Sequence, residues 1–325
     1  MGQNLTNLYN YFWEKVNKVR GTALLKEYSD VVSKRNIPYG LNIIRHRFDV
    51  HYPANMDGKL PTIFNIHGGG YIGGCKDGND RFCQELAKRG FVVFNVEYTP
   101  SGMDNKYFPT PIYEFFKFYK YMINETDFAS RIDFKNTFMC GNSSGGHVAS
   151  LIANIQANPN LKQEFNLQGG PPVKGSILIC PTFGVYNFNG MFPKKPFHEI
   201  VFGALTDRDP LAEDLTHGLK VTTDCFPPSI MFSVKGDVLV GAHKKPFLKM
   251  AKELDLSVQH YQVTAGYELM HCSMIRYSKE YPKCLDKIAE FVNDAKDNNF
   301  VKGVHLGYIK EDYIKPTEQL YAFTR

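Results

Sequence analysis

The chain carries the stretch TFMCGNSSGGHVASLIANIQA at residues 137–157. Its first four residues are typical of a buried strand, and the part from Gly146 onward favours a helix. Between the two lies a Gly-x-Ser-x-Gly pattern centred on Ser143. The bare pattern would be an ordinary turn, but a strand that passes through it directly into a helix predicts a sharp turn that exposes the serine hydroxyl.

Outward from this stretch, short apolar segments alternate with helical ones. We expect further extended segments at residues 41–50, 62–66, 91–96, 175–180, 229–234 and 258–263, and helices at 81–89, 113–122 and 282–295. Such alternation indicates an α/β fold with a mostly parallel sheet and helices on both faces. Functional groups in these sheets lie at the carboxyl ends of the strands. The other chemical groups are therefore sought in the loops that follow strands.

The domain organisation is predicted in three parts. Apolar residues at helical spacing make residues 1–40 an N-terminal helical cap segment, for which packing on the body of the protein is a simpler use than membrane contact. Residues 41–299 form the catalytic domain, and 183–226 interrupt it as a lid insertion rich in Pro, Gly and aromatic residues. Residues 300–325 are a tyrosine-rich C-terminal extension.

Composition excludes several classes of protein. With 43% hydrophobic and 22% charged residues the chain is suited to a large core rather than to disorder. The net charge of +5 is dispersed, which argues against nucleic acid as a partner. No run of about 18 apolar residues predicts a spanning helix, and no signal peptide is recognisable. Met1–Thr6 fits the short myristoylation pattern at Gly2, so a lipid-anchored protein at a membrane surface stays open as an alternative.

The seven cysteines are odd in number and scattered, with no pair or cluster at metal-ligand spacing. Reduced thiols in a cytoplasmic protein fit this distribution best. We therefore expect neither a metal nor an organic cofactor. The sequence leaves the oligomeric state open.

An activated serine needs a base, and the base needs an orienting carboxylate. In strand–turn–helix hydrolases these groups follow in the order Ser, Asp or Glu, His. Asp237 comes directly after the strand at 229–234, and His271 follows the last predicted strand. Glu268 also carries a carboxylate but lies too near His271 in sequence to orient it. Ser143, Asp237 and His271 are thus the predicted catalytic triad.

A glycine run lies directly after the strand at 62–66, in His67-Gly68-Gly69-Gly70. Such a run lets backbone N–H groups approach a ligand closely, as an oxyanion hole requires. A flexible turn or a phosphate loop are the alternatives, although no Walker or G-x-G-x-x-G pattern follows. We expect His67 and Gly68 to support the loop, and the Ser144 N–H to be a further oxyanion donor.

Together these motifs resemble the hormone-sensitive-lipase-like branch of the α/β-hydrolases, which contains bacterial carboxylesterases and arylacetamide deacetylases. The resemblance covers residues 40–295 and implies that Gly69 and Gly70 donate to the oxyanion. Asn142 stands where that branch usually has Asp, Ser144 where it has Ala, and Cys272 where Gly follows the histidine. These departures bear on the substrate and on the shape of the pocket rather than on the reaction type.

The function predicted from the resemblance is hydrolysis of small carboxylic esters, with short acyl chains, through an acyl-serine. An amide or N-acyl substrate would use the same triad and stays open. The alternative from another class is a ligand-binding protein on a hydrolase scaffold that no longer turns over.

Overall fold

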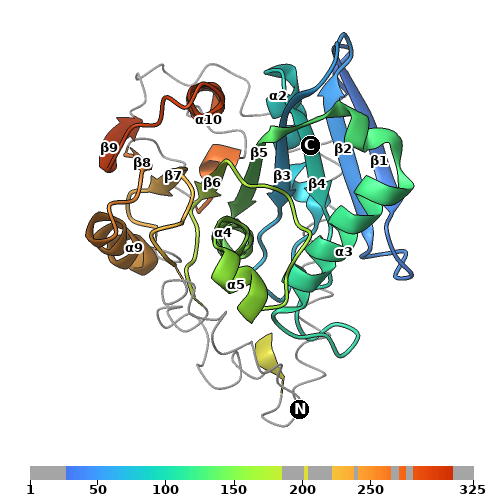
Figure 1. The fold of residues 1–325 in the computed structure, drawn as a ribbon, viewed down its shortest axis with the longest axis horizontal. Coiled ribbons are helices and arrows are strands. Elements are labelled where there is room, and N and C mark those ends of the chain that lie inside the picture. Colours follow the sequence, from blue (N-terminus) through green and yellow to red (C-terminus); the bar gives the residue numbers. More distant parts are fainter. Residues whose placement is uncertain are drawn as a thin grey trace, which may run out of the picture.

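A computed structural model of the chain describes residues 27–184, 201–203, 222–237, 241–264, 271–275 and 281–309. These residues build one nine-stranded sheet in the order β1-β2-β4-β3-β5-β6-β7-β8-β9 (Figure 1). The strands are β1 Val31–Pro38, β2 Arg47–Pro53, β3 Leu60–Ile66, β4 Val92–Val96, β5 Ile132–Asn142, β6 Gly175–Ile179, β7 Ser229–Val234, β8 Val258–Val263 and β9 Val304–Ile309. The helices are α2 Asp80–Lys88, α3 Thr110–Glu125, α4 Ser144–Ala157, α5 Pro159–Glu164, α9 Gly241–Glu253 and α10 Tyr281–Lys296, with 3₁₀ turns η1 Lys76–Asn79, η2 Asp127–Arg131 and η4 Ser273–Ile275.

The sheet is antiparallel only at one edge. β1 pairs with β2, and β2 with β4, in antiparallel register, whereas every pair from β4 onward along the sheet is parallel. The predicted mostly parallel α/β sheet is confirmed. Because the parallel strands all point the same way, the loops after β3, β5, β7 and β8 meet at one edge of the sheet.

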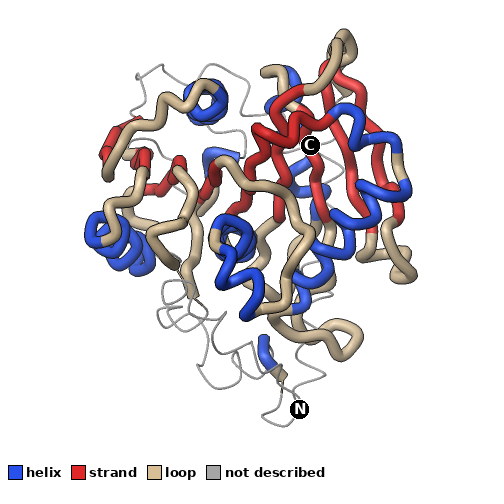
Figure 2. The backbone as a smooth tube through the Cα atoms, viewed as in Figure 1, coloured by secondary structure: helices blue, strands red, loops and turns tan. Residues whose placement is uncertain are grey.

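Helices cover both faces of the sheet (Figures 1 and 2). On one face α3 and α4 pack against an aromatic cluster that includes Phe48, Phe64 and Phe94. On the other face α2 and α10 enclose a second cluster, with Ile63 and Phe138 from the sheet. Neighbouring residues of β3 thus point to opposite cores, as the alternation of side chains along a strand requires.

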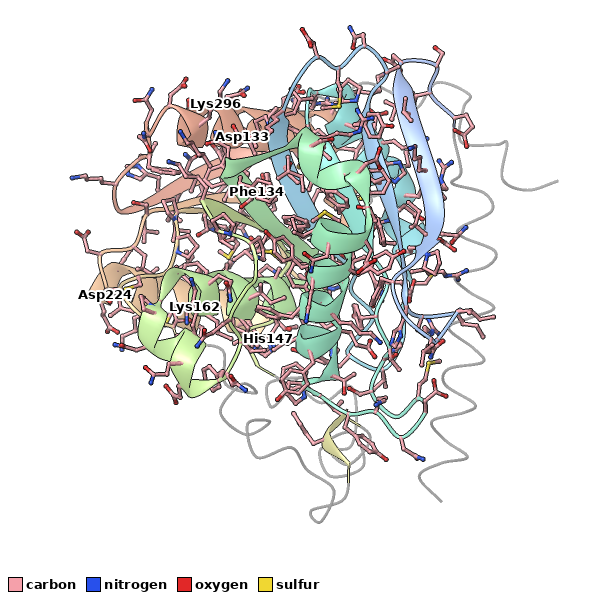
Figure 3. All side chains as sticks on the ribbon, turned by 45° about the vertical axis from the view of Figure 1, so that its right-hand side comes forward. Asp133, Phe134, His147, Lys162, Asp224 and Lys296 are labelled. Atoms are coloured by element: carbon pink, nitrogen blue, oxygen red, sulfur yellow. The ribbon has the colours of Figure 1, made fainter. Side chains whose placement is uncertain are left out.

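Helix α4 is buried on almost every side. All of its residues from Ser144 to Gln156 are buried, so it has no polar stripe facing solvent. Its first turn carries Gly145 and Gly146, and these small residues allow close packing between β3 and β6. In Figure 3, Asp133 near the start of β5 and His147 in the first turns of α4 lie at opposite ends of the molecule's central layer. The turn between β5 and α4 therefore lies at the edge of the sheet where the parallel strands end.

Two of the expected domain boundaries differ from the structure. Residues 31–38, expected within the helical cap, form the edge strand β1, because β2 offers them an antiparallel partner and Val31 a buried position. Residues 304–309, expected in a C-terminal extension, form β9 and extend the parallel sheet beside β8. Periodicity alone does not show such edge strands, because all but one residue of each strand is partly or fully exposed.

Several expectations fall outside the described residues. They concern Gly2, the first 26 residues of the helical cap, Glu268, residues 310–325 and most of the lid insertion. Of that insertion the structure describes residues 183–184, 201–203 and 222–226. Among these, Val201 and Phe202 are buried, and the Val201 carbonyl accepts a hydrogen bond of 2.9 Å from the Phe108 N–H. In the part of the chain that the structure describes, no helix has the length and apolarity needed to cross a bilayer.

Candidate active site

Ser143 stands on a strained turn between β5 and α4. Its backbone angles are φ 54° and ψ −124°, a region that non-glycine residues occupy at a cost of about 1–3 kcal/mol. The turn is held by neighbouring main chain, since the Ser143 N–H donates to the Ile179 carbonyl at 2.9 Å and its carbonyl accepts from the Thr182 N–H at 3.1 Å. Strain that the surroundings maintain in this way is typical of a functional position.

Gly145 allows this turn to sit against the end of β3. A Cβ atom on Gly145 would lie 2.3 Å from the carbonyl oxygens of both Ile66 and His67. No side chain fits at that distance, so the second glycine of the pattern is required by close approach. Ser144, the neighbouring hydroxyl, is fully buried as the first residue of α4, whereas Ser143 retains 9% exposure. This geometry favours Ser143 as the nucleophile.

Asp237 and His271 come together from two different loops. His271 Nδ1 lies 2.8 Å from Asp237 Oδ2, and the Asp237 side chain is only 2% exposed against 17% for His271. Burial by itself lowers the pKa of His271, but the hydrogen bond with Asp237 and the contact with Cys180 outweigh it and raise the pKa to about 9. The pair follows β7 and β8, at the edge of the sheet where the serine turn also lies.

The hydrogen bond between Ser143 and His271 that a catalytic triad requires is not formed in this structure. The Ser143 hydroxyl makes no hydrogen bond within the described part of the chain, and His271 Nε2 instead lies 3.4 Å from the Cys272 sulfur. Catalytic hydrogen bonds are often long without substrate and tighten in the substrate complex. The structure therefore brings Asp237 and His271 into contact but leaves Ser143 unbonded to them.

The glycine loop after β3 presents unpaired donors. Gly69 has φ 147° and Gly70 has φ 62°, and the N–H groups of these two residues and of Ser144 form no hydrogen bond to other described residues. The loop folds tightly on itself, because a Cβ atom on Gly69 would lie 2.0 Å from the Gly73 carbonyl oxygen. These are the features expected of an oxyanion-binding loop.

His67 contacts the glycine loop and its neighbours through its ring and its carbonyl group. Its ring stacks on Tyr98 with centroids 4.1 Å apart, the Tyr98 hydroxyl donates to the His67 carbonyl at 2.9 Å, and Nδ1 donates to the Gly68 carbonyl at 2.8 Å. The opposite ring nitrogen lies 3.3 Å from the carboxylate of Glu97. His67 is thus fully engaged in positioning the loop.

Glu97 is a site residue that the sequence did not reveal as one. Its buried carboxylate pairs with Arg45 at 3.0 Å and with His67, and it accepts from the Lys76 N–H at 2.8 Å. Burial by itself raises the pKa of Glu97, but His67 and Arg45 outweigh it and lower the pKa to about 2. A charged residue placed directly after the buried strand β4 was the available signal.

Asn142, which departs from the family pattern, connects the serine turn to the glycine loop after β3. Its Oδ1 accepts from the Gly68 N–H at 3.1 Å and from Asn79 Nδ2 at 2.9 Å, and its Nδ2 lies 3.9 Å from the Cys272 sulfur. Since Asn142 occupies the Gly68 N–H, the free donors of the loop are those of the two following glycines.

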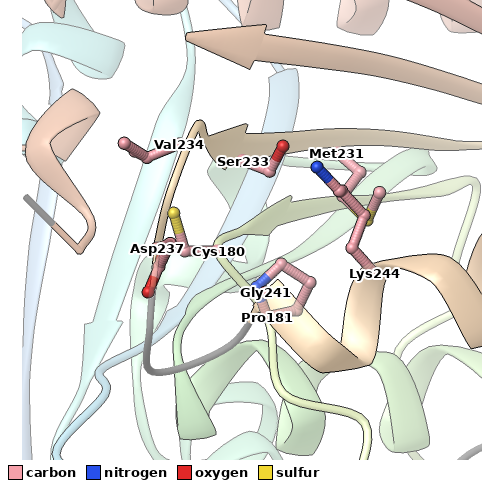
Figure 4. A pocket seen from close by; sticks show the side chains of 8 residues that line it. All are labelled: Cys180, Pro181, Met231, Ser233, Val234, Asp237, Gly241 and Lys244. Carbon is pink, nitrogen blue, oxygen red and sulfur yellow. The ribbon is translucent and has the colours of Figure 1, made fainter. Parts of the chain in front are cut away.

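A pocket opens behind Asp237, between β6, β7 and α9 (Figure 4). It is lined by Cys180, Pro181, Met231, Ser233, Val234, Asp237, Gly241 and Lys244. Asp237 is one of its lining residues, so the pocket borders the histidine–carboxylate pair. Its lining is mainly apolar, with the ammonium group of Lys244 as the one cation among the lining residues.

Comparison with known proteins agrees with this fold. The BD-FAE family model matches residues 48–250, which is more than half of the chain and runs from within β2 to within α9. The chain belongs to the BD-FAE family. This is an α/β-hydrolase family, so the predicted α/β-hydrolase fold and the resemblance to the hormone-sensitive-lipase-like branch are confirmed.

Relatives of this BD-FAE-family chain carry esterase names. An esterase of Gibberella moniliformis is 26% identical over 58% of this chain and 60% of its own length. The versiconal hemiacetal acetate esterase of Dothistroma septosporum is 36% identical over 38% of this chain and 35% of its own. The chain thus spans at most about 60% of the length of these relatives.

Solved structures share the fold over nearly the whole chain. Esterase B of Lactobacillus rhamnosis has a TM-score of 0.77 at 18% identity, and the match covers 91% of this chain and 97% of that one. An esterase of Pyrobaculum calidifontis has a TM-score of 0.67 at 17% identity, over 90% and 93% of the two chains. At sequence identities this low, the similarity shows a shared fold and nothing more.

Proposed function

We propose that the protein is a serine hydrolase that cleaves small carboxylic esters, with Ser143, Asp237 and His271 as its triad. The observation that carries the proposal is the strained Ser143 turn at the sheet edge where the Asp237–His271 pair also lies. A strained backbone with no function would be removed at little cost, whereas a nucleophile must be presented on such a turn.

The reaction follows from the positions of these groups. His271 Nε2 takes the Ser143 proton while Asp237 holds Nδ1–H and stabilises the imidazolium that forms. The serine oxygen attacks the ester carbonyl, and the N–H groups of Gly69, Gly70 and Ser144 bind the resulting oxyanion. The alcohol leaves with the proton from His271, and water then releases the acid from the acyl-serine by the same route. Ser143 and His271 must first close their hydrogen bond, as catalytic hydrogen bonds commonly do when substrate binds.

The substrate class comes from the relatives. They are named esterases, and a structure of esterase B of Lactobacillus rhamnosis is described with a tributyrin phosphonate, a mimic of a short-chain ester. Short acyl esters are therefore the substrates we propose to test first. An amide or N-acyl substrate would need the same machinery and is the second candidate.

The seven cysteines are all free thiols in the structure, in agreement with a reducing compartment. A cytoplasmic location is accordingly part of the proposal. No nucleic acid or organic cofactor enters it, and the partner is the small-molecule substrate.

The decisive experiment labels the protein with a fluorophosphonate and maps the modified residue by mass spectrometry. We expect labelling at Ser143 that is lost in His271→Ala, and ester turnover that falls by roughly 10⁴- to 10⁶-fold in Ser143→Ala. Ser150→Ala, a substitution within α4 away from the turn, is the matched control and should keep both. A folded protein that resists the label and turns over no ester would instead be a ligand-binding scaffold.

A further inference from the structure

Two cysteines converge on the proposed catalytic histidine. Cys180 directly follows β6, and Cys272 directly follows His271. The two sulfur atoms and one imidazole nitrogen of His271 all lie within 4.8 Å of one another. Since Nδ1 is held by Asp237, the nitrogen available to the sulfurs is Nε2, which is 3.4 Å from the Cys272 sulfur. The proposed hydrolysis uses neither thiol.

These separations suit a tetrahedral metal ion. Zinc binds thiolate sulfur at about 2.3 Å and imidazole nitrogen at about 2.0–2.1 Å, which places neighbouring ligand atoms about 3.5–3.8 Å apart. The Nε2–sulfur distance of 3.4 Å is already close to that spacing. A disulfide between the same cysteines would require the sulfurs to approach to about 2.05 Å with a narrow dihedral angle. Zinc therefore needs less movement of the chain than a disulfide does.

The surroundings also match those of a metal site. A histidine ligand usually donates its second nitrogen to a carboxylate, as His271 does to Asp237 at 2.8 Å. The Asn142 amide lies 3.9 Å from the Cys272 sulfur, where its N–H donates to a thiolate. Both thiols are buried, at 0% for Cys180 and 1% for Cys272, while the 17% exposure of the His271 side chain provides an entry from solvent.

We propose that Cys180, Cys272 and His271 bind one zinc ion and that zinc binding switches the hydrolase off. On binding, each thiol loses its proton to solvent and forms a Zn–S bond, and the Nε2 lone pair forms the third bond in place of a zinc-bound water. A fourth position remains for water. With its lone pair on zinc, His271 has none left for the Ser143 proton. The inhibition, unlike the binding, rests on the proposed function.

Binding is tested without reference to turnover. The full-length protein, reduced and freed of metal by a chelator, is titrated with Co²⁺ and then with Zn²⁺. We expect one Co²⁺ per chain with thiolate-to-cobalt charge-transfer absorption, displaced by Zn²⁺. Loss of even an outer partner weakens metal binding by about 10–100-fold, so Cys180→Ala and Cys272→Ala should each weaken it by at least about 100-fold. Cys83→Ala, which removes an equally buried thiol from α2, should bind as the wild type does.

Inhibition is measured next on a short-chain ester. Zinc should abolish wild-type turnover and a chelator should restore it, while each cysteine variant, compared with its own metal-free rate, should need at least about 100-fold more zinc. A folded, reduced protein that gives no charge-transfer absorption, or cysteine variants that bind zinc as tightly as the wild type, would overturn the site. Metal binding without any ester turnover by the metal-free protein would instead count against the proposed function alone.

Discussion

Asn142 shows how a single side chain can couple the parts of this site. It precedes the proposed nucleophile, yet its amide oxygen holds the glycine loop through the Gly68 N–H and also accepts from Asn79. An aspartate at this position would offer the same acceptor to both donors, whereas only an amide also offers an N–H to the Cys272 sulfur. The departure from the family pattern therefore keeps the support of the loop and adds a donor.

We expect Asn142→Ala to lower kcat/KM by about 10- to 100-fold, because two hydrogen bonds of about 0.5–1.5 kcal/mol each disappear and the oxyanion donors lose their position. Asn142→Asp keeps the acceptor and should retain most of the activity. Steady-state kinetics on a short-chain ester measures both, with circular dichroism as the check on folding. Equal losses in the two variants would show that the acceptor does not matter.

The raised pKa of His271 predicts how the rate depends on pH. Burial opposes the shift, but Asp237 and the contact with Cys180 bring the pKa to about 9. Only the neutral imidazole can take the Ser143 proton, so kcat/KM should rise with pH and level off above about 9. The profile is measured with a chelator present and corrected for spontaneous hydrolysis. A midpoint at or below 6.5, the usual value of the group, would contradict the prediction.

At the scale of elements, the loops of the site rest on a buried polar network between β2, η1 and α2. Lys76 pairs with Asp49 at 2.8 Å, and both side chains are fully buried. His51 of β2 lies 2.9 Å from the Ser33 hydroxyl and 3.6 Å from Asp80 of α2. A network of this kind is satisfied only while each member keeps its protonation state, so its stability depends on pH.

His51 should make the protein sensitive to mild acid. Burial lowers its pKa to about 4, helped by Arg35 and Lys76 and opposed by Asp80. Below the usual value of 6.5 the unfolded chain takes up a proton that the folded chain does not. The contribution of His51 to the free energy of unfolding is therefore complete above pH 6.5. Roughly 3 kcal/mol of it is lost as the pH falls from 6.5 to 4.

The variant His51→Asn tests this, because its amide can still reach the Ser33 hydroxyl but does not titrate. Urea unfolding at a series of pH values should give a flatter dependence of the free energy of unfolding between pH 6.5 and 4 in the variant, whatever its overall stability. Parallel curves for the two proteins would exclude His51 as the source of the slope.

For the whole molecule, the aromatic cluster under α3 carries much of the stability. Phe64 of β3 is fully buried and its ring lies 5.3 Å from that of Phe94 and 5.9 Å from that of Phe115. Removing a ring from such a cluster leaves a cavity in a region that has no room to collapse.

Phe64→Ala should therefore lower the free energy of unfolding by about 3–5 kcal/mol, read as a shift in the urea midpoint. Leu41→Ala is the control, since Leu41 is 96% exposed and its loss should change the free energy by less than about 0.5 kcal/mol. A loss below about 1 kcal/mol in Phe64→Ala would mean that the cluster repacks around the missing ring.

Most helices and the inner strands of this molecule were predictable from local pattern, whereas the helices α5 and α9 and the edge strands β1 and β9 were not. Residues 113–122 and 282–295 were expected as helices and lie within α3 and α10. Strand β9 was not predicted, because most of its residues are exposed and it has no buried apolar run. Its pairing with β8 is what makes it a strand.

The same division applies to the candidate site. The β5–α4 turn, the glycine loop after β3 and the order of Ser143, Asp237 and His271 were all determined by the sequence, because each depends on a few adjacent residues and on the alternation of strands and helices. The contacts of Asn142 and Glu97, and the meeting of Cys180 with Cys272 at His271, were decided by the tertiary structure alone. They join residues 21 to 130 positions apart in the chain, and only the order of strands in the sheet brings these together.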